Sequence, residues 1–355
     1  MERSALFEGS RAMPHSRPTR RTLLAAGGAL GLGAALPACG TGGEAAAGPG
    51  ASGATTGPWS FTDDRGTTVR LDARPASLVA FTGVAAALHD YGVRVKGVFG
   101  PTTTRDGTPD VQAGDLDVTE VTVLGNEWGR LNVERYAALA PDLLLTVTYD
   151  TAGTLWSVPE ESKDKIAELA PSLAVSVYDR QLTEPLRRVW ELAGALGADL
   201  EAPAATAARK RFEDAAARLR AAARARPEIR VLAGSASPEL FYVSGSDLSV
   251  DLEYFKALGV NLVEPPAAAK KATGGWFESL SWENVDTYPA DVIIMDDRSS
   301  AIQPADITEA TWKRLPAVRA GQVIPRSAEP ILSYAKCAPL LERLAEAIEK
   351  AEKVG

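Results

Sequence analysis

Two glutamates, Glu134 and Glu283, lie in matching stretches of the sequence. Each follows a helix-capping residue by two positions and precedes an aspartate by eight, in the patterns Asn132, Glu134, Asp142 and Ser281, Glu283, Asp291. Asn and Ser side chains accept hydrogen bonds from the free amides at a helix N-terminus. One explanation of each Glu is its attraction to the helix dipole, worth roughly 0.3–1 kcal/mol. The other is that two equivalent carboxylates bind arginines of a partner, because such pairs are geometrically specific.

Aromatic and arginine side chains lie near the predicted ends of several strands. They are Trp128, Arg130, Tyr149, Trp156, Tyr242, Trp276, Phe277 and Arg298. Ligands of open α/β sheets bind beyond the carboxyl ends of the strands. Such side chains suit a bulky ligand with apolar and oxygen-rich faces. Packing within the protein is the alternative for each Trp or Tyr, and Arg105 and Arg326 are weaker candidates.

Residues for metal binding or covalent catalysis are scarce. Once an N-terminal leader is removed only His89 remains, beside the apolar run 85–88, where we expect a helix-surface or core role. Zinc sites usually need several His or Cys ligands. The chain also lacks a G-x-S-x-G elbow and a GK[ST] phosphate loop. We therefore predict no catalytic residue, no protein-held metal and no cofactor, with an exported enzyme as a lesser alternative.

The elements that must position these residues follow an α/β pattern. Short runs rich in Val, Ile and Leu alternate with segments of helical period, which predicts two similar lobes of mostly parallel sheet flanked by helices. The predicted strands are 78–82, 95–99, 143–148, 173–177, 229–233, 260–263, 291–295 and 322–325. An amphipathic helix is predicted from about Pro339 to Lys353, with its leucines facing inward.

A long polar helix separates the two halves. Residues 200–227 are rich in Ala, Arg, Lys and Glu, which favour helices, and Pro227 ends the segment. Only a narrow apolar stripe of Phe212, Ala216 and Leu219 is present, so we predict a strut between an N-terminal lobe, 59–199, and a C-terminal lobe, 228–355. An ordinary surface helix of one lobe is the alternative.

The N-terminus predicts export and a lipid anchor. Residues 1–38 combine a basic stretch with an apolar one, as in a secretory signal, and Arg20-Arg21 lies in a twin-arginine-like motif. Leu36-Pro37-Ala38-Cys39 resembles a bacterial lipobox, in which the cysteine is acylated. Residues 39–58, rich in Gly, Ala and Thr, predict a flexible tether. Cys337 then has no disulfide partner, and its apolar surroundings predict a buried thiol.

Charge excludes one class of partner. The 355 residues carry a net charge of −8, and the first 38 hold five Arg against two Glu, so removing them leaves −8 − 3 = −11. An acidic chain is a poor partner for nucleic-acid phosphates. No apolar run reaches the roughly 20 residues of a membrane-spanning helix, so contact with the membrane is expected only through the lipid.

Several segments of the chain resemble those of a known family. It is similar to the substrate-binding lipoproteins of iron–siderophore ABC importers, in the class whose lobes are joined by one long helix. The most specific segment is LNVERYAALAPDLLLT, matched within the chain by LSWENVDTYPADVIIM. FTDDRGTTVRL, LPAVRAGQVI and SYAKCAPLLERLAEAI support the resemblance, which covers almost everything after residue 58.

The resemblance implies an extracytoplasmic, monomeric receptor that holds a ferric siderophore in a cleft between its lobes and delivers it to a permease and its ATPase. In that family one Glu of each lobe docks onto permease arginines, and the matching positions are Glu134 and Glu283. Iron already wrapped in a chelator needs no protein ligand, which agrees with the shortage of His. Haem, with Tyr149 or Tyr242 as axial ligand, and cobalamin are alternative ligands. A sensor without a permease is an alternative role.

Overall fold

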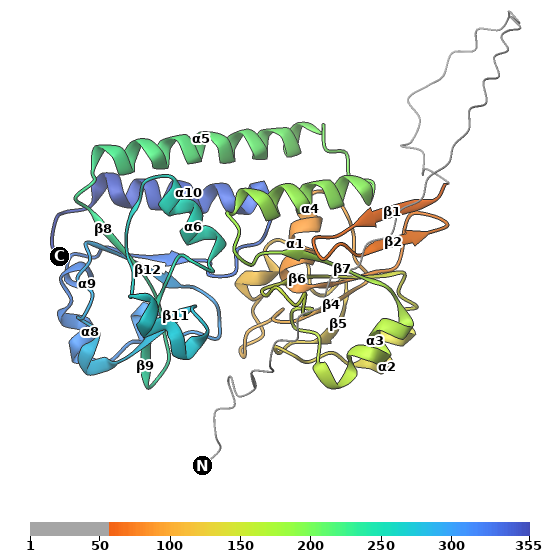
Figure 1. Ribbon diagram of the computed structural model, residues 1–355, viewed down its shortest axis with the longest axis horizontal. Coiled ribbons are helices and arrows are strands. Elements are labelled where there is room, and N and C mark those ends of the chain that lie inside the picture. Colours follow the sequence, from red (N-terminus) through yellow and green to blue (C-terminus); the bar gives the residue numbers. More distant parts are fainter. Residues whose placement is uncertain (1–56) are drawn as a thin grey trace, which may run out of the picture. The chain divides into compact units, whose positions relative to one another are not determined.

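Five short apolar strands form the sheet of the N-terminal lobe. The computed structural model describes residues 57–355, so Cys39, the predicted signal and nearly all of the predicted tether lie outside it. All five strands are parallel, in the order β5-β4-β3-β6-β7 (Figure 1). Their bounds are β3 Leu78–Phe81, β4 Gly97–Phe99, β5 Thr122–Gly125, β6 Leu143–Thr148 and β7 Ser172–Ser176. β6 is buried along its whole length, as expected for a central parallel strand.

The sheet of the C-terminal lobe is mixed. Its strands are β8 Arg230–Ala236, β9 Leu240–Ser244, β10 Asn261–Val263, β11 Phe277–Ser281, β12 Val292–Asp296 and β13 Val323–Arg326. The order is β11-β9-β8-β12-β13, and β10 pairs with the first half of β8. β9 and β11 are antiparallel to their neighbours, so this edge is the exception in two sheets that are mostly parallel, as predicted. The physical reason is the three-residue connection 237–239, which permits only a hairpin between β8 and β9.

Helices and one hairpin surround the two sheets. The hairpin pairs β1 Trp59–Thr62 with β2 Thr68–Leu71. The shorter helices are α1 Thr82–Asp90, α2 Val133–Ala138, α3 Lys163–Leu169, α4 Thr183–Ala195, α6 Val250–Ala257, α7 Ala267–Lys270, α8 Ala310–Arg314 and α9 Pro316–Arg319. Two longer ones, α5 Pro203–Ala225 and α10 Tyr334–Lys350, run side by side (Figure 1). Within residues 57–355 no helix combines the length and the apolarity that crossing a membrane requires.

α5 is more than a strut. It lies parallel to α10 in constant register, since Arg211 and Arg218 each make two hydrogen bonds to a glutamate of α10, at distances of 2.6–2.9 Å. Phe212 is buried and its ring lies 5.9 Å from that of Tyr254 in α6 and 5.4 Å from that of Tyr334 in α10. The apolar face of α5 is therefore wider than the stripe that the sequence predicted. Alanines outside the predicted stripe supply the rest of the apolar face, because Ala205, Ala215, Ala222 and Ala223 are also buried.

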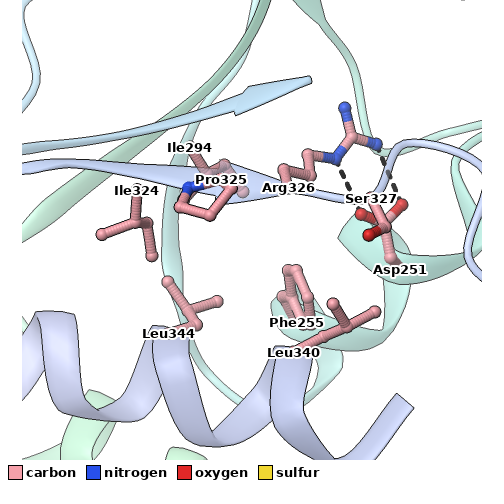
Figure 2. Close-up of a pocket in the computed structure, with 9 residues that line it drawn as sticks. All are labelled: Asp251, Phe255, Ile294, Ile324, Pro325, Arg326, Ser327, Leu340 and Leu344. Carbon is pink, nitrogen blue, oxygen red and sulfur yellow. Dashed lines mark hydrogen bonds and ion pairs between the residues drawn. The ribbon is translucent and has the colours of Figure 1, made fainter. Parts of the chain in front are cut away.

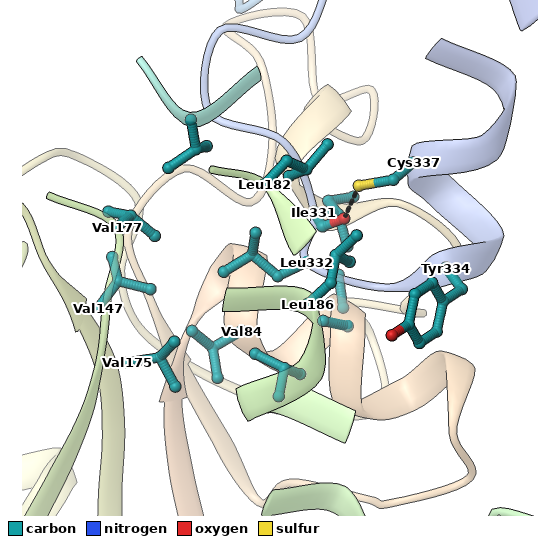
Figure 3. Close-up of a cluster of buried hydrophobic side chains, with 14 of the residues drawn as sticks. Val84, Val147, Val175, Val177, Leu182, Leu186, Ile331, Leu332, Tyr334 and Cys337 are labelled. Atoms are coloured by element: carbon teal, nitrogen blue, oxygen red, sulfur yellow. Dashed lines mark hydrogen bonds between the residues drawn. The ribbon is translucent and has the colours of Figure 1, made fainter. Parts of the chain in front are cut away.

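One hydrophobic core continues from the N-terminal lobe into α10. Figure 3 shows this junction, where the segment entering α10 packs against α1, α4 and the ends of β6 and β7; its labelled members are Val84, Val147, Val175, Val177, Leu182, Leu186, Ile331, Leu332, Tyr334 and Cys337. The Cys337 thiol is buried, as predicted, and donates to the Ile331 carbonyl at 3.3 Å. A continuous core of this kind resists large rotations of one lobe against the other.

Candidate ligand-binding site

Four of the predicted ligand-binding residues form one chain of touching rings, which we call the aromatic cluster: Trp128, Trp156, Tyr149 and Trp276. The Trp156 ring centroid lies 4.2 Å from that of Trp128 and 4.2 Å from that of Tyr149. Tyr149 in turn lies 5.7 Å from Trp276. The first three rings belong to the N-terminal lobe and Trp276 to the C-terminal lobe, so the aromatic cluster crosses from one lobe to the other.

Backbone contacts fix the middle of the aromatic cluster. Tyr149 directly follows β6, and the chain then turns back so that the Trp156 amide donates to the Val147 carbonyl at 3.0 Å. The Thr146 hydroxyl donates to the Trp156 carbonyl at 2.8 Å. The next residue, Ser157, is buried with φ +62°, a conformation that is strained for a non-glycine residue. Strain of this kind is retained where the surrounding contacts demand one conformation.

Burial controls the protonation of Tyr149. Burial raises the pKa of Tyr149 well above its ordinary value, and the nearby Glu329 carboxylate raises it further. The phenol is therefore neutral at any physiological pH. A neutral phenol can both donate and accept a hydrogen bond.

Arg298 is held by two carboxylates of the C-terminal lobe. Its guanidinium donates to Asp296, with the shortest contact at 2.7 Å, and forms a further ion pair with Glu329. Although burial opposes the charge, Glu329 and Asp296 raise the pKa of Arg298 above its ordinary value. Arg298 is thus permanently charged, but one cation already faces two anions. An anionic ligand would have to compete with both carboxylates for it.

Two polar contacts join the lobes beside Arg298. The Gln112 amide donates to Glu329 at 2.8 Å, and the Ser299 hydroxyl donates to Asp110. The sequence analysis did not select Glu329, Gln112, Asp110 or Ser299. The rule that ligands lie beyond the carboxyl ends of strands could have found them, because they follow β4, β12 and β13 along the chain.

The other predicted ligand-binding residues lie outside the aromatic cluster. Tyr242 and Phe277 pack against each other on β9 and β11, with ring centroids 5.1 Å apart. Arg130 is exposed, and its guanidinium approaches Glu127 at 3.7 Å. Arg326, the weaker candidate, makes a buried two-point ion pair with Asp251 at 2.7 and 2.9 Å.

That ion pair borders the small cavity of Figure 2. The cavity lies between β13, α6 and α10, and its volume is about 10 Å³. A single water needs about that much space, so the cavity is too small for a bulky ligand. Its remaining walls are mostly apolar, with Phe255, Ile324, Leu340 and Leu344 facing it in Figure 2. Arg326 is therefore best explained as a structural residue.

Glu134 and Glu283 occupy exposed positions at the start of short helical turns. Asn132 caps α2 as predicted, because its side chain accepts from the Arg135 amide at 2.9 Å. The matching prediction for Ser281 is wrong. Glu283 lies in a 3₁₀ turn, Trp282–Asn284, and Ser281 makes no capping bond to a backbone amide. Its hydroxyl instead accepts from the Asn284 side chain at 3.1 Å, since a single 3₁₀ turn presents few free amides.

The aspartates of the two matching stretches share one structural role. Asp142 accepts from the amides of Ala76 and Ser77, both at 2.8 Å, just before β3. Asp291 accepts from the Arg230 amide at 2.8 Å, at the start of β8. Each aspartate therefore ties the start of one strand to the start of its parallel neighbour. This explains why both stretches place an Asp immediately before a buried strand.

Comparison with known proteins identifies the family of the chain. A family model described as "Periplasmic binding protein" matches residues 80–328, and the chain belongs to this family. The recognition made from the sequence is confirmed, as is the α/β fold class. No curated protein sequence matches the chain.

Solved structures narrow the comparison. The chain is 78% identical to DesE, a ferric-siderophore receptor from Streptomyces coelicolor, over 84% of this chain and 100% of that one, with a TM-score of 0.83. Two more distant structures share the fold. The siderophore periplasmic binding protein from the fuscachelin gene cluster of Thermobifida fusca is 22% identical over 78% of this chain and 97% of that one, with a TM-score of 0.55. Staphylococcus aureus SirA is 19% identical over 83% and 99%, with a TM-score of 0.56.

Proposed function

We propose that the protein is the solute-binding component of an ABC importer and that it captures a ferric siderophore between its lobes. The observation that carries the proposal is the 78% identity to a ferric-siderophore receptor along that receptor's entire length. The aromatic cluster supports it, because rings from both lobes line up at the carboxyl ends of the strands, where ligands of such sheets bind.

The chemistry of the site suits a preformed chelate. Aromatic rings offer broad apolar surfaces to the chelator backbone, and indole, phenol and amide groups offer hydrogen bonds to its oxygens. Iron in such a complex is already fully coordinated, so the protein supplies no ligand to the metal and no cofactor takes part. We propose binding without catalysis, in keeping with a family of binding proteins.

The direct test is to purify the protein from an iron-starved culture of its source and identify co-purified small molecules by mass spectrometry. A ferric chelate bound in about equal molar amount would support the proposal. Haem or cobalamin in its place would retain the importer role and overturn the substrate.

We further propose that Glu134 and Glu283 are the two permease-docking residues. Both carboxylates are exposed, and neither forms an ion pair within residues 57–355, so both are free to meet arginines of a permease. Hydrogen bonds from the Glu283 backbone and from Ser281 lower the pKa of Glu283, which keeps that carboxylate charged. The partners are accordingly a permease and its ATPase, with the receptor acting as a monomer.

Transport measurements separate docking from ligand binding. Glu134→Ala and Glu283→Ala should each reduce uptake of the chelate, and the double variant should reduce it most, while ligand affinity stays unchanged. Exposed Glu201→Ala, which lies just before α5 and outside the matching stretches, is the control. Loss of ligand binding in either single variant would place that glutamate in the binding site instead.

Export and anchoring complete the proposal. The signal-like residues 1–38 and the lipobox cysteine, Cys39, support secretion followed by acylation, with 39–58 as a tether. A lipid at that position would keep the receptor on the outer face of the membrane, close to its permease.

A further inference from the structure

The indole N–H of Trp156 is buried and has no hydrogen-bond acceptor within residues 57–355. Two buried tryptophans elsewhere in the protein have a partner for this group. The indole of Trp59 donates to the Ala195 carbonyl at 2.8 Å, and that of Trp282 donates to the Pro238 carbonyl at 3.2 Å. Buried donors are almost always paired, and leaving one unpaired is costly. The unpaired donor of Trp156 lies inside the aromatic cluster, where a bound ligand could supply the missing acceptor.

Trp156 is fixed by its backbone, whereas its neighbour Trp128 lies half-exposed on a loop. The backbone of Trp156 is bonded on both sides to the end of β6. Trp128 lies on the loop between β5 and α2, and 50% of its surface is exposed although its ring rests edge-on against Trp156. The loop is tied down next to Trp128 by the Gly129 amide, which donates to the buried Ser157 hydroxyl at 3.1 Å. That contact holds the loop beside Trp156 and leaves the Trp128 ring at the surface.

We propose that the Trp156 indole N–H donates a hydrogen bond to an oxygen of the bound chelate, and that Trp128 is the ring that covers this donor while the site is empty. The inference rests on the proposed function and adds a residue-level role to it. A donor held rigidly by β6 loses little conformational freedom when it binds, which favours affinity. Shielding by an apolar ring keeps water from the donor, so that a ligand oxygen does not have to displace a bound water.

The acceptor expected at this donor is an oxygen that carries partial negative charge, such as a hydroxamate, catecholate or carboxylate oxygen of the chelate. Such oxygens strengthen an N–H hydrogen bond, since charge on the acceptor shortens and strengthens it. Removing the N–H while keeping an aromatic ring should therefore weaken binding without opening the site. Trp156→Phe makes that change.

The test uses gallium(III) and iron(III) complexes of a trihydroxamate, a triscatecholate and a carboxylate siderophore as probes. Gallium is diamagnetic, so the indole N–H signals of the seven tryptophans stay visible by NMR in protein labelled with ¹⁵N-tryptophan. The signal absent from Trp156→Phe identifies Trp156. On binding, the Trp156 proton should move downfield as it acquires an acceptor, while that of Trp282 should stay in place.

Affinity and rate measurements complete the test. Trp156→Phe should weaken binding by about 3- to 10-fold. Trp282→Phe, the matched control with a satisfied indole, should bind as the wild type does. Trp128→Ala should bind faster than the wild type, because no ring has to move aside. A Trp156 signal that does not shift, together with wild-type affinity in Trp156→Phe, overturns the donor role.

Further outcomes separate the parts of the proposal. Association by Trp128→Ala that is no faster than that of the wild type would overturn the covering role of that ring. A wild-type protein that binds none of the probes overturns the proposed function itself. If Trp156→Phe folds poorly, Phe variants of the other six tryptophans assign their own signals, and the remaining indole signal of the wild-type protein is that of Trp156.

Discussion

Replacement by asparagine should cost much more stability at Asp291 than at Asp142, the two aspartates that join the starts of neighbouring strands. In Asp291 both carboxylate oxygens are used. One accepts from Val354 at 2.9 Å and Gly355 at 2.7 Å, and the other accepts from the Arg230 amide and the Lys353 ammonium, both at 2.8 Å. Asparagine has a single acceptor oxygen, so two of the four donors lose their partner whichever way the amide is oriented. At roughly 1–2 kcal/mol for each, Asp291→Asn should lower the free energy of unfolding by about 2–4 kcal/mol.

Asp142 supplies the matched comparison. Its two amide donors, from Ala76 and Ser77, both meet the same oxygen. Asparagine can place its oxygen there and lose only the strength that the negative charge adds, about 0.5–1 kcal/mol. Urea unfolding of both variants at neutral pH measures the difference. Equal losses, or a larger loss at Asp142, would refute the hydrogen-bond accounting.

The pH dependence gives the same prediction a second test. Although burial raises it, hydrogen bonds from Lys353 and from the amides of Arg230, Gly355 and Val354 lower the pKa of Asp291 to about 2. A lowered pKa means that the stabilisation is complete above the unfolded value, near pH 4, and is lost as the pH falls towards 2. The difference in stability between the wild type and Asp291→Asn should therefore be constant from pH 5 to 7 and shrink below about pH 4. A difference that persists at pH 2 would contradict this explanation.

Three further predictions concern function. Arg298→Ala leaves Asp296 and Glu329 without their cation, so the protein should be less stable by about 3–5 kcal/mol, and an anionic ferric complex should lose more affinity than a neutral one when both are titrated. Cys39→Ala should move the protein from the membrane fraction to the soluble fraction, and unchanged retention would argue against the lipid anchor. The iron-free chelator should bind more weakly than its ferric complex in calorimetry, because an unwrapped ligand loses more conformational freedom; equal affinities would contradict this.

The sequence predicted the buried strands well and the polar ones poorly. All eight predicted strands are present, because parallel strands covered on both faces form continuous apolar runs such as Leu143–Thr148. β1, β2, β5, β9 and β11 were missed. β11 consists of Phe277, Glu278, Ser279, Leu280 and Ser281, a half-polar pattern that indicates a loop as readily as an edge strand.

The site was predicted as a set of residues and not as a set of contacts. Trp128, Tyr149, Trp156 and Trp276 were selected one by one from their places after or beside strands, and the structure joins them into the aromatic cluster. Pairwise electrostatics were out of reach, because the partners are distant in sequence. Gln112 and Glu329 are 217 residues apart, and no local pattern signals that they meet. Arg298 therefore looked like a free cation, although two carboxylates hold it.

The central claim, that this protein binds a ferric siderophore between its lobes, is tested most directly by titrating it with ferric siderophores while recording tryptophan fluorescence. Ferric hydroxamates, catecholates and carboxylates form the panel, with haem and cobalamin as controls. A ferric chelate absorbs light and would lie against Trp156 and its neighbours, so saturable quenching by one siderophore class at sub-micromolar concentration is the predicted result. Quenching by haem or cobalamin alone, or by none of the compounds, would contradict the claim.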